Sequence, residues 1–320
     1  MSSSPDEGVY PDYDAPEGQI DLSNRLCPLL VVRALSKFEF EDVRRLAAEL
    51  CGRIHPKVLI PIMSYQLKNA TCVKDLLKIK ACLFSICISL LVNGTDAYAH
   101  PDMFWIHQAI ETILLWPSVD GDDISKAQHG CIDCLPLILC TELQATKAVK
   151  NSISIEVCFE QSIVSSGDSL TKDSVCSYVI HHLVCDEDIS VMLGRNEVVK
   201  AHQSFRLRMA NVLITACQKV PSASKKPFVS KILPRVLHCV EEIANSEVRS
   251  ACIQVFFSML YHLKSLVLPY SSDLLKVSIK SPREGSEKER IAGAKLLASL
   301  MASEEAVLQK ISGGLVEART

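Results

Sequence analysis

A positively charged residue recurs at a fixed interval in the carboxyl half of the sequence. Arg208, Arg249 and Arg290 are 41 residues apart, and each is followed two positions later by an alanine. After Ala251, large apolar residues continue along one helical stripe. An interval of about 40–47 residues is typical of arrays of helix pairs, because one pair cannot bury its own apolar stripe and must stack on the next. The interval therefore predicts an all-α chain of stacked helix pairs.

Apolar residues at helical spacing extend this pattern over most of the 320 residues. The chain has only 12 glycines and is 48% apolar, which favours helices with a substantial core over a turn-rich sheet protein. We expect about seven pairs, each with a first and a second helix. The expected pairs are 22–35 with 39–54, 56–70 with 71–92, 103–116 with 124–143, 153–164 with 174–184, 189–194 with 198–220, 228–245 with 248–264, and 274–280 with 287–301.

One of the second helices carries a motif that is known from a repeat family. Asp42-Val43-Arg44 is followed by Ala47-Ala48 and Leu50, and this order resembles the second helix of a HEAT repeat. The segment from about residue 22 to residue 301 resembles a HEAT/armadillo-type array, and it is more similar to HEAT than to armadillo repeats. The resemblance implies a right-handed α-solenoid of about seven stacked helix pairs. It implies no particular partner.

The recurrent cation of the second helices has two possible roles. The cations in question are Lys80, Lys126, Arg208, Arg249 and Arg290. We favour a structural ladder, in which each cation pairs with an acidic residue of a neighbouring turn, and Asp42, Glu247 and Glu287 are available for this. The alternative is a stripe of cations that contacts a binding partner.

The two ends of the chain differ from the repeats. Residues 1–19 contain acidic side chains, prolines and no Lys or Arg, so we expect an acidic, flexible amino-terminal tail before an array over residues 20–302. Residues 303–320 are expected to form a carboxyl-terminal capping helix or tail. The last recognised helix has Ile291, Ala294, Leu297 and Leu300 on one stripe. Because terminal repeats normally need a polar cap, we expect this end to be bound by a partner or to belong to a longer array.

No residue pattern predicts a catalytic or cofactor site. The glycines lack G-x-G spacing, and no phosphate-loop, nucleophile-elbow or H-E-x-x-H motif is present. Two clusters contain residue types that bind metals: His129, Cys131, Cys134 and Cys140, and Cys176, His181, His182 and Cys185. Both lie in strongly apolar predicted helices, where cysteine packs as a small hydrophobe. We therefore interpret them as core residues and expect a non-enzymatic protein without a cofactor or metal.

The 14 cysteines and the apolar runs also bear on the compartment. Five of the cysteines, Cys82, Cys87, Cys217, Cys239 and Cys252, lie within aliphatic helical patterns, whereas a disulfide scaffold would be a shorter, loop-rich, secreted chain. The sequence begins without a basic-then-apolar leader, and its most apolar run, residues 81–92, is too short to cross a bilayer. We expect a cytoplasmic or nuclear protein without a membrane span.

The remaining alternatives concern the partner. One basic patch is present, formed by Lys219, Lys225, Lys226, Lys231 and Arg235. It could serve nucleic-acid binding, but no aromatic residues alternate with these cations and the net charge is only −3, so we favour a solvated loop. We expect a scaffold or adaptor that binds an extended protein segment or helix along a concave surface lined by the second helices. A nucleic-acid-associated array is the alternative, an enzyme comes third, and no small-molecule substrate is expected.

Overall fold

The fold is described from a computed structural model, which places residues 17–118, 121–145, 174–184 and 195–302. Within these ranges every regular element is a helix, and no strand occurs. The predicted all-α class is therefore confirmed. Several predicted segments lie outside the described residues: most of the acidic tail, the helices at 153–164 and 189–194, and the carboxyl-terminal cap at 303–320.

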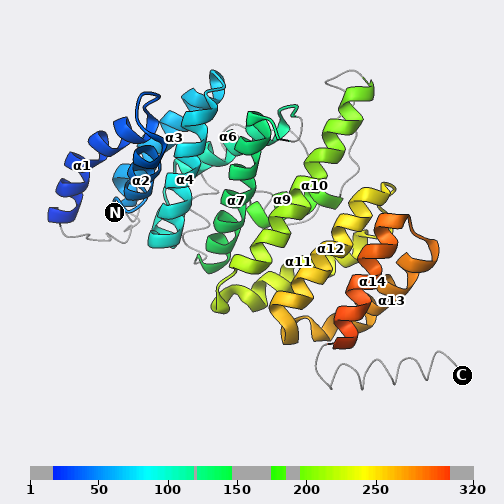
Figure 1. The fold of residues 1–320 in the computed structure, drawn as a ribbon. Helices are drawn as coiled ribbons and strands as arrows, with labels where there is room; N and C mark the ends of the chain where they lie inside the picture. Colours follow the sequence, from blue (N-terminus) through cyan, green and yellow to red (C-terminus); the bar gives the residue numbers. More distant parts are fainter. Residues whose placement is uncertain (1–16, 119–120, 146–173, 185–194, 303–320) are drawn as a thin grey trace, which may run out of the picture.

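The helices follow one another in chain order from α1 at one end to α14 at the other (Figure 1). Their bounds are α1 Glu17–Leu35, α2 Glu41–Cys51, α3 Pro56–Cys72, α4 Leu76–Asn93, α5 Thr95–Tyr98, α6 Met103–Leu115, α7 Asp123–Gln144, α9 Val175–Val184, α10 Arg195–Lys219, α11 Lys225–Cys239, α12 Ser246–Leu263, α13 Ser271–Glu284 and α14 Glu287–Ala302. Three short 3₁₀ turns, Ser222–Ser224, Lys264–Leu266 and Leu268–Tyr270, connect the later helices.

The helix contacts define two rows. The second-helix row consists of α2, α4, α7, α10, α12 and α14, and each member contacts the next one directly. The first-helix row consists of α1, α3, α6, α9, α11 and α13; α1 contacts α3, α3 contacts α6, and α9 contacts α11. The contacts along the second-helix row are the more extensive of the two, so this row carries most of the packing between successive pairs.

Capping residues set where several of these helices begin. The Asn245 side chain accepts hydrogen bonds from the backbone N–H groups of Glu247 and Val248, at 2.9 and 3.1 Å, and so caps α12. The Asp75 side chain accepts from the N–H of Lys78 at 3.4 Å and caps α4. The prediction that this helix starts at residue 71 is wrong, because α3 continues to Cys72 and Lys74 then adopts a φ of +53°.

Other predicted bounds also shift. α1 begins at Glu17, within the segment predicted as a tail. α11 is Lys225–Cys239 rather than 228–245, and α13 is Ser271–Glu284 rather than 274–280. The changes do not alter the order of the helices.

The buried apolar residues form one cluster, with members from helices of both rows. The alanines that follow the recurrent cations, Ala210, Ala251 and Ala292, are all buried. Phe205 and Phe256 are completely or almost completely buried among them. Small residues let neighbouring helices approach closely, and the large residues fill the space between layers. Both the small and the large residues of this pattern are thus buried in the carboxyl half.

The most apolar helix is α4. Among the described helices it alone is long and apolar enough, by length and composition, to span a membrane. It also contacts α1, α2, α3 and α7, and Ile79, Cys82 and Ile86 are completely buried in these contacts. Packing between helices accounts for the apolar character of its buried side, and a single such helix is weak support for a membrane span.

Candidate partner-binding surface

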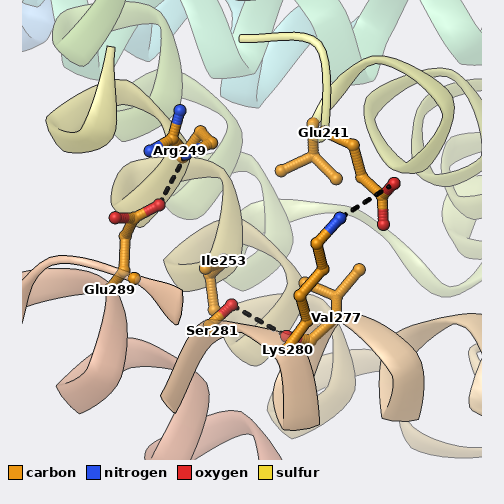
Figure 2. Close-up of a pocket in the computed structure, with 9 residues that line it drawn as sticks. Glu241, Arg249, Ile253, Val277, Lys280, Ser281 and Glu289 are labelled. Carbon is orange, nitrogen blue, oxygen red and sulfur yellow. Dashed lines mark hydrogen bonds and ion pairs between the residues drawn. The ribbon is translucent and has the colours of Figure 1, made fainter. Parts of the chain in front are cut away.

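Arg249 connects three parts of the carboxyl half. From α12 its Nε donates a hydrogen bond to Glu289 Oε1 of α14 at 2.6 Å (Figure 2). Its Nη1 donates to the carbonyl oxygens of Ile243 and Ala244 at 2.5 and 2.9 Å. The Glu289 residue is only 4% exposed. Burial acts to raise the pKa of Glu289, but hydrogen bonds from Arg249 and Ser286 outweigh it and lower the pKa overall. This contact is an internal link between neighbouring second helices.

The other recurrent cations are placed differently. Lys80 of α4 lies 3.8 Å from Asp123 Oδ1 of α7, and Lys126 lies 3.1 Å from the same oxygen. Arg208 of α10 donates to the carbonyl oxygen of Leu114 at the end of α6 and to Ser118 Oγ, the latter at 2.9 Å. Arg290 is exposed and forms no ion pair with any residue in the described ranges. These four cations therefore occupy three kinds of environment: an exposed ion pair, a contact with the end of α6, and an exposed position without an ion pair in the described ranges. They do not share one environment, as a uniform stripe would require.

The acidic residues predicted for the ladder are only partly those that form it. Glu247 accepts hydrogen bonds from Gln203 of α10 and Lys288 of α14, and so links three successive second helices. Glu287 is exposed in the first turn of α14, and Glu289, two residues later, faces α12 instead. The signal for Glu289 was present in the sequence, because this glutamate directly precedes the next recurrent cation. The 41-residue interval does not identify this glutamate, because Glu289 lies 40 residues after Arg249.

A small pocket lies beside this contact, between α12, α13 and α14 (Figure 2). Its volume is about 180 Å³, and its lining includes Glu241 and Lys280, whose charged groups are 3.3 Å apart. Small-molecule sites usually occupy about 300–1,000 Å³. The pocket is smaller than that, and its Arg, Lys and Glu side chains already pair with one another. We regard it as a gap between layers rather than a ligand site.

Four helices of the second-helix row, α4, α7, α10 and α12, each have exposed or half-exposed side chains on one face, and together we call these residues the row surface. Its exposed or half-exposed members are Lys80, Phe84 and Leu91 of α4; Lys126, His129 and Asp133 of α7; Asn211, Thr215 and Gln218 of α10; and Gln254 and Tyr261 of α12. Within each helix these residues recur at spacings of three, four or seven, which places them on one face. On α4 these residues are apolar apart from Lys80, on α7 they are mixed in charge, and on α10 and α12 they are uncharged.

The basic patch is not part of the row surface. Lys225, Lys226, Lys231 and Arg235 all belong to α11, which is in the first-helix row. Lys219 is at the end of α10, and its Nζ lies 3.4 Å from Asp133 Oδ1 of α7. The structure thus brings four of the five predicted cations together on one helix and pairs the fifth with a carboxylate.

The cysteine–histidine clusters are located mainly in the core. Cys131, Cys134 and Cys140 are buried in α7, and burial raises the pKa of the Cys140 thiol to about 12. His129 is exposed on the same helix, and its Nδ1 lies 2.7 Å from the Ser125 carbonyl oxygen. Over the described part of the chain, no group of three or more His, Cys, Asp or Glu side chains is placed to hold a metal ion.

The second cluster contributes to an aromatic contact between three helices. The ring of Tyr178 in α9 is 4.8 Å from that of His107 in α6 and 4.5 Å from that of His182. Phe205 of α10 packs edge-on to His182 at 5.3 Å. Burial and the neighbouring His182 lower the pKa of His107 to about 4. Cys176 is buried, and Cys185 lies outside the described residues.

In a comparison with known proteins, no protein-family model and no curated protein sequence matches the chain.

Proposed function

We propose that this chain is a right-handed α-solenoid of the HEAT/armadillo type, built from about seven helix pairs, and that it acts as a non-catalytic scaffold or adaptor. The observation that carries the proposal is the unbroken succession of contacts along the second-helix row, from α2 to α14. Such a succession creates one long surface rather than one enclosed site. In this proposal a protein partner lies along the row surface.

The chemistry of the row surface describes the partner. Phe84 and Leu91 of α4 suit an apolar side chain, while Asn211 and Gln254 offer amide groups that can hydrogen-bond an extended backbone. Helix axes in contact are about 8–10 Å apart, so the row from α4 to α12 extends over about 25–30 Å. An extended peptide rises about 3.3 Å per residue. We therefore propose an extended segment of about eight residues with an apolar end toward α4.

Nucleic acid remains the second candidate because of the cations on α11. At the row surface, however, Asp123 lies 3.8 Å from Lys80 and 3.1 Å from Lys126, and Asp133 lies 3.4 Å from Lys219. A balanced surface gives no electrostatic attraction for a phosphate backbone. Four of the five patch cations belong to α11 in the first-helix row, whereas the proposed partner site is on the second-helix row, so the two candidates can be tested separately.

A photo-crosslinking amino acid placed on each surface tests the proposal. Incorporation at Asn211 or Gln254, both exposed on the row surface, should yield the same protein adduct from native extract. Incorporation at Ser230, exposed on α11, is the matched control and should not yield it. Adducts that form equally from all three positions, or from Ser230 alone, would refute binding along the row surface.

The nucleic-acid candidate has its own measurement. Binding of duplex DNA or RNA is titrated with salt, for the unaltered chain and for a variant with Lys225, Lys226 and Lys231 changed to Glu. We expect weak binding at low salt and unaltered partner adducts in the variant. Tight binding that falls steeply with salt and is abolished in the variant would favour the nucleic-acid function instead.

The thiols are consistent with a reducing compartment, which we propose to be the cytosol or nucleus. All 12 cysteines in the described ranges are free, and most of them are buried. Burial raises the pKa of Cys82, Cys217 and Cys252 to about 12. These side chains act as small core residues in the proposed scaffold.

A further inference from the structure

The amino-terminal end of the helix rows exposes an apolar face. On α1, Leu22, Leu26, Leu29 and Val32 are 57%, 42%, 66% and 69% exposed. Their spacings of four, three and three residues place them on one side of the helix. The opposite side of α1 contains Cys27, Val31 and Ala34, which are buried against the neighbouring helices. The helix is therefore apolar on two sides, and only one of them is used for packing within the described chain.

The next helix, which contacts α1, and the connection before it also expose large apolar side chains. Leu46 and Leu50 of α2 are 58% and 43% exposed, and Phe38 and Phe40 in the connection are 100% and 82% exposed. Ala47, Ala48 and Cys51 on the other side of α2 are buried. Each later second helix up to α12 has another second helix on both sides, whereas α2 has only α4. We call the eight exposed residues of α1, α2 and their connection the end face.

The end face has the size of a stable interface. A fully exposed large apolar side chain offers roughly 150–200 Å², so the exposed fractions of the eight residues correspond to on the order of 800 Å². Each partner in a standard protein–protein interface buries about 800 Å². A monomer rarely exposes contiguous apolar surface beyond a few hundred Å². The exposed area of the end face alone therefore indicates that a binding partner covers it.

The charges around the end face indicate which partner covers it. Three ion pairs lie on the same helices and their ends: Arg25 with Asp21 at 3.0 Å, Arg33 with Glu39 at 3.5 Å, and Arg53 with Glu49 at 3.2 Å. These pairs thus contribute as many positive as negative charges to the helices that carry the end face. In a two-fold interface the same patch is used twice, so each cation of one copy can meet an acid of the other. A strongly acidic or basic partner gains nothing from such a rim.

We propose that the end face binds a second copy of this chain, two-fold and end to end, so that α1 and α2 of one copy pack on α1 and α2 of the other. The second-helix rows of the two copies then form one surface about twice as long. This arrangement requires no property of the row surface, so it stands or falls independently of the proposed scaffold function.

Sedimentation equilibrium of the full chain tests the proposal. The expected species at micromolar concentration has twice the chain mass of 35.3 kDa. A double variant, Leu29→Glu with Val32→Glu, should remain folded because both side chains are exposed, and it should raise the dimer dissociation constant at least roughly 100-fold. Circular dichroism and thermal melting verify that the double variant is folded.

A matched control and a deletion exclude the other occupants. Tyr65 of α3 is 64% exposed, as Leu29 is, but lies outside the end face, so Tyr65→Glu should leave the dimer unchanged. Deletion of residues 1–16 should also leave it unchanged. A full chain that is monomeric at about 100 µM, a double variant that remains dimeric, or a dimer that appears only after the deletion would each overturn the proposal. The last result would show that residues 1–16 cover the face themselves.

Discussion

The carboxyl and amino halves of this molecule join their second helices by different means. From α10 to α14 the links use carboxylates: Glu289 pairs with Arg249, and Glu247 accepts from the Gln203 amide and pairs with Lys288. Between α2 and α4 the links are close contacts of small groups, such as Ser85 Oγ donating to the Ala48 carbonyl oxygen at 2.9 Å, and the ion pair between α4 and α7, Lys80 with Asp123, is exposed. A charged link needs a cation and an acid at a nearly fixed separation along the chain, so it imposes a regular interval on the sequence. Contacts of small residues impose none, which explains why the repeat is regular only in the carboxyl half.

The largest effect is expected where the charged link is most buried. Replacing Arg249 with methionine leaves the Glu289 carboxylate without its cation, and breaking a buried ion pair in this way costs about 3–5 kcal/mol. We expect the free energy of unfolding of the α12–α14 region to fall by an amount near the lower value. Arg290→Met is the matched control, because this exposed arginine forms no ion pair within the described ranges, and surface changes are usually within about 0.5 kcal/mol. Equal effects in chemical denaturation would show that Arg249 does not link the helices.

The junction between the halves, where α6, α9 and α10 meet, should respond to pH. Burial, with a contribution from His182, lowers the pKa of His107 to about 4, against an ordinary 6.5. The unfolded chain therefore binds a proton below pH 6.5 that the folded chain accepts only near pH 4, and the free energy of unfolding decreases as the pH falls through this window. The slope is at most about 1.4 kcal/mol per pH unit.

The His107→Gln variant isolates this contribution. The glutamine does not titrate, so the variant should lose less stability than the unaltered chain between pH 6.5 and 4. Burial also raises the pKa of Glu111, one turn along α6, but that carboxyl group is present in both proteins and cancels in the comparison. Parallel stability curves for the two proteins across this window would contradict the account of His107.

The close contacts of the amino half are tested by adding one methyl group. A Cβ at Gly52 would lie 2.4 Å from Ile88 Cβ and 2.7 Å from the Ser85 carbonyl oxygen, so Gly52→Ala should separate the end of α2 from α4. We expect a loss of about 1–3 kcal/mol, as for other overpacked sites. At Gly130 in α7 the same methyl group would meet only the end of the Leu83 side chain, at 3.3 Å. Gly130→Ala should be neutral or stabilise the helix by up to about 1 kcal/mol, and thermal melting distinguishes the two variants.

The smallest effect is expected at the counterpart of Arg249 in the amino half. Lys80 and Asp123 are 3.8 Å apart and both substantially exposed, and such pairs contribute about 0–1 kcal/mol. Lys80→Met should therefore change the free energy of unfolding by less than about 0.5 kcal/mol. A loss comparable to that of Arg249→Met would mean that the two halves are linked in the same way after all.

The sequence predicts the helical class, most of the helices, and the buried alanines, because these depend on local apolar spacing and on a repeated interval. It does not predict that Glu289 rather than Glu287 faces α12, since that depends on how α14 is rotated against its neighbour. It also does not distinguish the two apolar sides of α1. Cys27 and Val31 pack inside while Leu26 and Leu29 are exposed, and only the position of the other helices decides between them.

The same limit applies to the candidate surfaces. The cations at 41-residue intervals suggest a single stripe, yet Arg208 turns toward the end of α6 and Arg249 toward α14. The basic patch is contiguous in the sequence of α11, but its location in the first-helix row follows from packing alone. Long side chains reach whatever partner the neighbouring helix offers, and their sequence spacing does not determine that partner.

Hydrogen exchange on the unaltered chain, Gly52→Ala and Arg249→Met, measured in parallel, tests the central claim most directly. If each helix pair depends only on its neighbours, Gly52→Ala should accelerate exchange in α2 and α4 and leave α12–α14 protected, and Arg249→Met should do the reverse. An increase spread evenly from α2 to α14 in either variant would contradict the account, because it would mean that the chain unfolds as one cooperative unit.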